Sequence, residues 1–68
     1  MMRLKSIAID WYTFTDKYNQ VFRAEARGFG TYSIYMLSNR SDCFYHVAVV
    51  RITGKATARK LYEAYVYA

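Results

Sequence analysis

Hydrophobic and polar residues alternate along much of this chain, and a period of two is the pattern of half-buried β-strands. Residues 20–29, QVFRAEARGF, show the alternation most clearly. The apolar residues of this stretch fall on one face and the charged residues on the other: Phe22, Ala24 and Ala26 against Arg23, Glu25 and Arg27. Residues 31–37, TYSIYML, alternate in the same way and predict a second strand. Gly28 and Gly30 lie between the two strands and predict a hairpin turn, because glycine accepts positive φ.

Two further stretches have strand composition. Residues 4–14, LKSIAIDWYTF, are rich in β-branched and aromatic residues and predict one strand, which the polar residues of TDKYN end. Residues 43–52, CFYHVAVVRI, are the most apolar part of the chain. Apolar residues on both faces of a strand favour a place at the centre of a sheet.

The last segment, residues 53–68, has a different period. Ala58, Leu61 and Tyr65 recur at helical spacing, and basic residues occupy the other side of the predicted helix. Thr53 is suited to cap its start. The pattern therefore predicts an α+β domain over residues 1–68, with a four-stranded antiparallel sheet followed by one C-terminal helix. A helix of about four turns covers only one face of such a sheet, so the other face is the place to look for function.

Size limits how this domain is stabilised. With 68 residues it is near the lower limit for a domain that folds alone. Cys43 is the only cysteine and His46 the only histidine, so we expect neither an internal disulfide nor a structural metal. Aromatic residues make up 19% of the chain and supply the core that a short chain otherwise lacks. Self-association would add burial, and we expect a homodimer.

Targeting signals are not visible in the sequence. The first ten residues, MMRLKSIAID, interrupt their apolar run with polar and charged residues, and no stretch reaches the length of a membrane span. A lone cysteine fits a reducing compartment. We therefore expect a cytoplasmic protein without a membrane partner.

Charge points to a polyanionic partner. Ten Lys and Arg residues stand against five Asp and Glu residues, giving a net charge of +5. In so small a domain this excess attracts nucleic acid or an acidic protein surface, although it also serves solubility alone.

Catalysis has little support in the sequence. The five acidic residues are scattered over different predicted elements, and none forms a pair with the spacing of an acid–base site. Cys43 and His46 are three residues apart, which on a strand places them on opposite faces. We therefore expect a binding protein without cofactor rather than an enzyme.

One short motif carries a resemblance. Arg27-Gly28-Phe29-Gly30, followed by TYSIY, resembles the basic and aromatic strand signature of RNA-recognition motifs. The same residues, with DCFYH at 42–46 and DWY at 10–12, also resemble cold-shock domains. Thr31 stands where an aromatic residue should follow, and the predicted order of elements matches neither family. We interpret the motif as local convergence on a glycine hairpin flanked by aromatic residues.

The residues that suit nucleic-acid binding are basic side chains for phosphates and rings for stacking on bases. We predict that they are Tyr12, Arg23, Arg27, Phe29, Tyr35, Arg40 and Tyr45. Single-stranded nucleic acid, RNA above all, is the first predicted ligand. Tyr and Arg are also favoured anchors at protein interfaces. The alternative is therefore a small phage-type inhibitor or adaptor that docks on a larger protein, such as a nuclease. A third interpretation is that the uncovered face only closes a homodimer, which would bury Tyr12, Tyr35 and Tyr45. Tyr35 and Tyr45 also suit cross-strand neighbours with a structural role alone.

Overall fold

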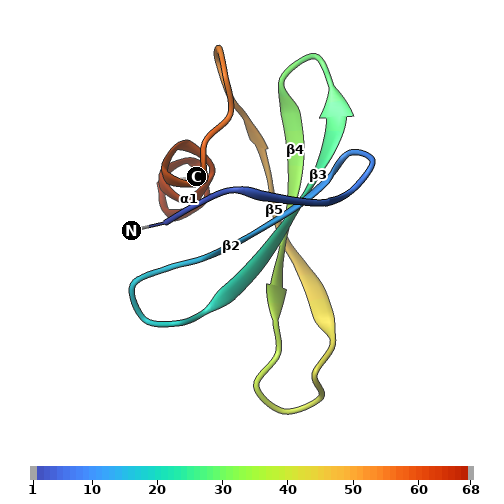
Figure 1. Ribbon diagram of the computed structural model, residues 1–68, viewed down its shortest axis with the longest axis vertical. Helices are drawn as coiled ribbons and strands as arrows, with labels where there is room; N and C mark the ends of the chain where they lie inside the picture. Colours follow the sequence, from blue (N-terminus) through green and yellow to red (C-terminus); the bar gives the residue numbers. More distant parts are fainter. Residues whose placement is uncertain (1, 68) are drawn as a thin grey trace.

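The computed structural model describes residues 2–67, which form one antiparallel sheet and one helix (Figure 1). The elements are β1 (Lys5–Ala8), β2 (Trp11–Thr15), β3 (Val21–Gly28), β4 (Thr31–Leu37), β5 (Phe44–Arg51) and α1 (Ala58–Val66). The strand order is β1-β2-β3-β4-β5, so each strand pairs with the strand that follows it in the chain. The α+β class and the single C-terminal helix are confirmed.

The sheet has five strands, not four, because the segment predicted as one strand folds into a hairpin. β1 pairs antiparallel with β2, and the chain reverses at Ile9 and Asp10. Asp10 has a φ of 63°, a left-handed conformation that Asp tolerates better than most residues. Ile9 is 89% exposed at the tip of this turn. The apolar pattern continues through the turn without interruption, and this is why alternation alone did not reveal it.

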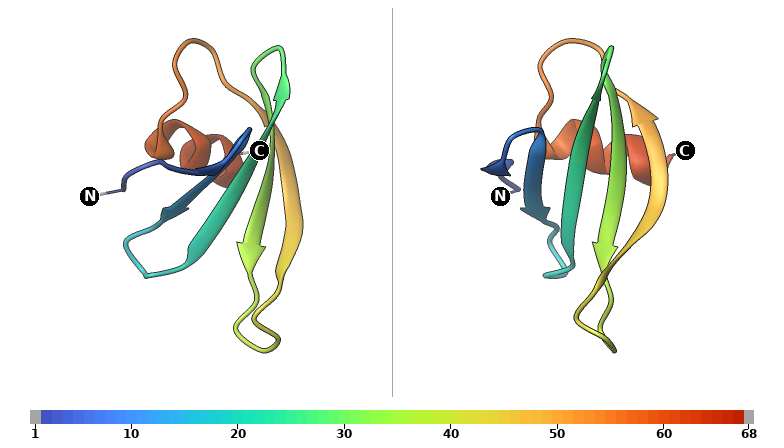
Figure 2. Two further views of the ribbon diagram at one scale, coloured as in Figure 1. Left: turned by 45° about the vertical axis from the view of Figure 1, so that its right-hand side comes forward. Right: turned by 90° about the vertical axis from the view of Figure 1, so that its right-hand side faces the viewer.

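The helix α1 lies across one face of the sheet and encloses the core. The right-hand view of Figure 2 shows the sheet in front and the helix behind it. Phe14 and Phe22 stack with their ring centroids 5.0 Å apart, and Leu61 of α1 is fully buried. The buried apolar side chains are Phe14, Phe22, Ala24, Ile34, Val50, Ile52, Ala58 and Leu61. The predicted alternation in β3 and β4 is confirmed, since their inward residues belong to this core.

The most apolar strand, β5, lies at an edge of the sheet, and its predicted central place is wrong. β5 is apolar on its inner side because Ala48 and Val50 pack into the core beneath α1. On the other side Val49 remains 56% exposed. The register between β4 and β5 shifts by one at a bulge, where Val47 has no partner on β4.

The predicted turn between β3 and β4 is confirmed and depends on glycine. Phe29 and Gly30 form its tip with φ values of 55° and 76°, the pattern of type I′ hairpin turns. The amide of Ile52 donates to the carbonyl of Gly30 at 2.7 Å. A Cβ atom at Gly30 would lie 2.6 Å from the carbonyl oxygen of Ile52, so no larger residue fits there without movement of the backbone.

The helix starts later than predicted. Thr57, not Thr53, is the N-cap, and its side chain accepts a hydrogen bond from the amide of Lys60 at 3.1 Å. Residues 53–57 form a loop in which Gly54 has a φ of 77°, and this left-handed glycine prevents a helix from beginning at Thr53. α1 is therefore only nine residues long. Within residues 2–67 no helix combines the length and apolar character that crossing a membrane requires.

Candidate nucleic-acid interface

The sheet face turned away from α1, called the open face below, carries one row of side chains from four strands. Thr13 of β2 lies opposite Arg23 of β3, Arg23 opposite Tyr35 of β4, and Tyr35 opposite His46 of β5. Side chains of directly opposed residues stand on the same face of a sheet. Since Phe22, Ala24 and their partners point into the core, this row points away from it.

Three rings line up across the open face. The centroids of Trp11 and Tyr35 are 5.5 Å apart, with β3 between their strands, and those of Tyr35 and His46 are 5.3 Å apart. The planes of these pairs are inclined at 41° and 67°. Trp11 and Tyr35 are half-buried, and His46 is exposed. We call these three residues the ring row.

A fourth ring holds an arginine in place beside the ring row. The guanidinium carbon of Arg23 lies 4.0 Å from the ring centroid of Phe44, a cation–π geometry. Arg23 remains exposed, so its charged group is available to an anion.

The charge of the open face is predominantly positive. Its register places Lys5 beside Thr13 at one edge and Arg51 beside Thr31 at the other. Arg27 donates a hydrogen bond from Nη1 to Ser33 Oγ at 3.3 Å, although Ser33 is fully buried. Counting Arg23, the part of this face that residues 2–67 form therefore carries four basic residues and one carboxylate, that of Glu25 on β3.

Three of the seven predicted binding residues meet on the open face: Arg23, Arg27 and Tyr35. Tyr12 and Tyr45 lie on the helix-side face, because Tyr12 opposes Ala24 and Tyr45 opposes Met36. Tyr45 Oη donates to Met36 Sδ at 3.2 Å. The predicted pairing of Tyr35 with Tyr45 is therefore wrong.

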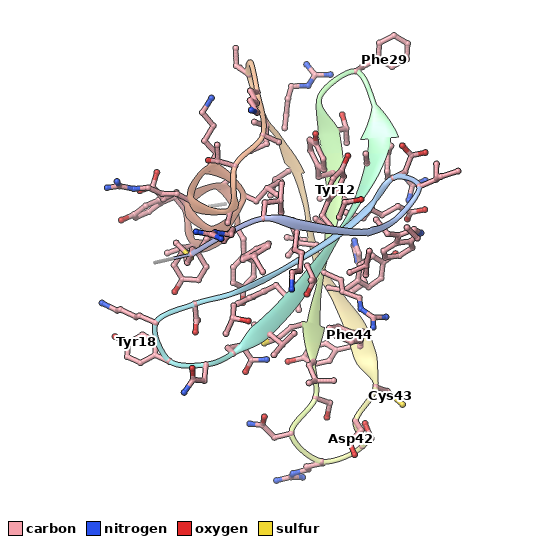
Figure 3. All side chains as sticks on the ribbon, viewed as in Figure 1. Tyr12, Tyr18, Phe29, Asp42, Cys43 and Phe44 are labelled. Carbon is pink, nitrogen blue, oxygen red and sulfur yellow. The ribbon has the colours of Figure 1, made fainter. Side chains whose placement is uncertain are left out.

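The remaining two predicted residues lie in loops at opposite ends of the sheet. Phe29 projects from the tip of the β3–β4 hairpin and is 97% exposed (Figure 3). Arg40 lies in the loop between β4 and β5. A positive φ is unusual for a bulky residue, so Phe29 holds a strained backbone while contributing nothing to the core.

Sequence reasoning missed Trp11, Phe44 and His46 as members of this surface. Alternation did place Trp11 on the face opposite Tyr12. Which of those two faces was open depends on how β2 is registered against β3, and alternation within one strand does not show this.

No cluster that would suit a metal ion stands out in the described part of the chain. Residues 2–67 contain no group of three or more His, Cys, Asp and Glu side chains placed to bind one. Beside the ring row there is an open hollow of about 420 Å³ lined by Ile7, Ala8, Trp11 and Arg23.

Comparison with protein-family models, with curated proteins and with solved structures found no match for this chain.

Proposed function

We propose that this protein is a non-enzymatic binding module that takes single-stranded nucleic acid on its open face. The observation that carries the proposal is the ring row of Trp11, Tyr35 and His46 with the exposed guanidinium of Arg23 beside it. Single-strand binding proteins combine these two elements, rings on which bases stack and cations that follow the phosphates.

Stacking on the rings would contribute binding energy without a preference for particular bases. A stacked base contributes about 1–3 kcal/mol, so two stacked bases suffice for useful affinity. Trp11 and Tyr35 expose part of each ring, and no element of residues 2–67 covers the open face. Rings that are accessible on a sheet surface favour an unpaired base over a duplex, in which the base faces are already stacked.

The basic side chains would contact the backbone of the ligand. Arg23 lies beside the ring row, directly opposite Tyr35. Arg27 and Arg51 extend the positive charge toward the β3–β4 hairpin. Each phosphate that a basic side chain neutralises releases counterions. The logarithm of the binding constant should therefore fall linearly with the logarithm of the salt concentration, with a slope of about −0.7 for each phosphate contact to a single strand.

Binding of fluorescent single-stranded oligonucleotides, measured by anisotropy at several salt concentrations, tests this function. We expect affinity that falls with salt and is lost when both Arg23 and Arg27 are changed to glutamate. Arg59→Glu is the matched control for a single charge reversal, Arg23→Glu, because Arg59 is exposed on α1. Equal losses for these two single variants would show that net charge alone attracts the ligand. Binding that does not respond to salt would reject the proposal.

A second candidate is an inhibitor or adaptor that docks on a larger protein through apolar contacts. It is favoured by the apolar residues Ile7 and Val49, which are 46% and 56% exposed beside the ring row and add nothing to phosphate binding. A complex with a host protein that survives nuclease and high salt, and is lost on Val49→Glu, would select this function.

A further inference from the structure

The two edges of the sheet differ in how they are protected. β1 is four residues long, interrupted by a bulge at Ile7, and carries Lys5. Short strands, bulges and lysines are devices that prevent edge strands from pairing with other chains. β5 is eight residues long, has the sequence FYHVAVVR and contains neither lysine nor proline. Its one bulge, at Val47, lies in the middle of the strand and leaves two outward-facing residues on either side. Figure 2 shows no further strand beyond it. β5 is therefore the edge open to pairing.

The hydrogen bonds around β5 show which of its backbone groups point outward. The amide of Ile52 donates to Gly30, and the amide of Ser38 donates to the carbonyl of Cys43 at 2.8 Å. Hydrogen-bonded pairs alternate with non-bonded pairs along an antiparallel ladder. The hydrogen-bonded pairs at the two ends of the β4–β5 ladder are Ser38 with Cys43 and Gly30 with Ile52. Alternating inward from these two pairs, the residues of β5 that direct N–H and C=O away from β4 are Phe44, His46, Val49 and Arg51.

These four positions are symmetric about the bulge. Phe44 and Arg51 lie at equal distances from the midpoint between Val47 and Ala48, and so do His46 and Val49. Without the bulge, a strand offers outward groups at every second residue. The additional residue Val47 places three residue steps, instead of two, between the outward-facing residues His46 and Val49. Only a partner strand with the same three-step spacing matches all of these outward groups. A second β5 running antiparallel has that spacing at the same place.

We infer that β5 pairs with β5 of a second copy of this chain, about a two-fold axis between Val47 and Ala48. Phe44 then lies opposite Arg51 of the second copy, and His46 opposite its Val49. A ring beside a guanidinium and an imidazole beside a valine are compatible pairs, and no like charges oppose each other. The two sheets join into one, with both open faces on the same side. This pairing does not depend on nucleic-acid binding.

Light scattering over a dilution series tests the dimer. We expect twice the monomer mass of 8.0 kDa at high concentration. Val49→Pro removes an outward amide that β4 does not use, so it should shift the mass to that of the monomer while circular dichroism remains unchanged. Ile7→Pro is the matched control at the bulge of β1 and should leave the dimer intact. A monomeric mass for the unaltered protein at every concentration, or a dimer that persists with Val49→Pro, would overturn the inference.

A distance measurement on the unaltered sequence covers the case in which Val49→Pro does not fold. Cys43 is an exposed free cysteine and takes a spin label directly. In the inferred register the two copies of Cys43 are nine residues apart along paired strands. Double electron–electron resonance should therefore give a separation of about 30 Å between the backbones of the two Cys43 residues, before allowance for the length of the labels. A clearly shorter separation, or no coupling in a sample of dimeric mass, would show that the copies meet elsewhere.

Discussion

Arg23 and Phe44 lie on strands separated by β4, yet the guanidinium carbon of Arg23 is 4.0 Å from the centroid of the Phe44 ring. The contact crosses the open face diagonally, since Arg23 is in the row of Tyr35 and Phe44 is in the row of Leu37. A cation–π contact at an exposed site is worth about 0.5–1 kcal/mol, so it favours this conformation of the Arg23 side chain. A prearranged cation loses less conformational entropy on binding.

Trp11→Ala should weaken single-strand binding about 5- to 140-fold, the range for one lost stacked base. Tyr18→Ala is the control, because Tyr18 is 73% exposed in the β2–β3 turn and takes no part in the ring row. Trp11 is the only tryptophan, so its own fluorescence reports the ligand in the unaltered protein. Equal affinities for the two variants would contradict a stacking role for Trp11.

Phe29→Asn should stabilise the fold by about 0.5–1 kcal/mol, because Asn accepts positive φ and Asn-Gly is the preferred type I′ pair. Urea denaturation measures the change. If the ring of Phe29 also contacts the ligand, the same variant should bind more weakly. A stabilised variant with full affinity would remove Phe29 from the binding site and leave its strain unexplained.

Gly30→Ala should cost more than about 2 kcal/mol of unfolding free energy, since it adds backbone strain and a close contact with Ile52. Gly28→Ala is the matched comparison. Gly28 has a φ of 92° but no atom within 4 Å of an added Cβ, so only strain of about 1–2 kcal/mol is expected. Thermal and urea unfolding should rank the two variants in this order. A larger loss for Gly28→Ala than for Gly30→Ala would contradict the close contact between residue 30 and the Ile52 carbonyl.

Thr57→Ala should destabilise the protein by about 1 kcal/mol, the usual cost of a lost N-cap. Thr53→Ala should be nearly neutral, because Thr53 interacts with Lys60 through its backbone carbonyl, which the substitution retains. Urea unfolding of both variants checks this. Equal losses would indicate that the helix begins earlier than Thr57.

The sequence was sufficient for the class of fold and for the two faces of β3 and β4. Alternation of Phe22, Ala24 and Ile34 with polar neighbours fixes a face wherever one side is buried. It did not reveal the turn at Asp10, because no glycine or proline marks that turn. Alternation within one strand also does not show which of its two faces matches the buried face of the next strand. The faces of Tyr12 and Tyr45 depend on register, and the bulge at Val47 shifts that register by one residue.

The meander has a consequence for the order of folding. Each strand joins the one before it through a short connection, so the sheet grows by successive local hairpins without waiting for distant segments. α1 is the last element, and until Leu61 docks, the inner surface formed by Phe14, Phe22 and Ile34 has no cover. Apolar surface that is exposed in this way favours aggregation, so the docking of α1 protects the sheet from it as well as completing the core.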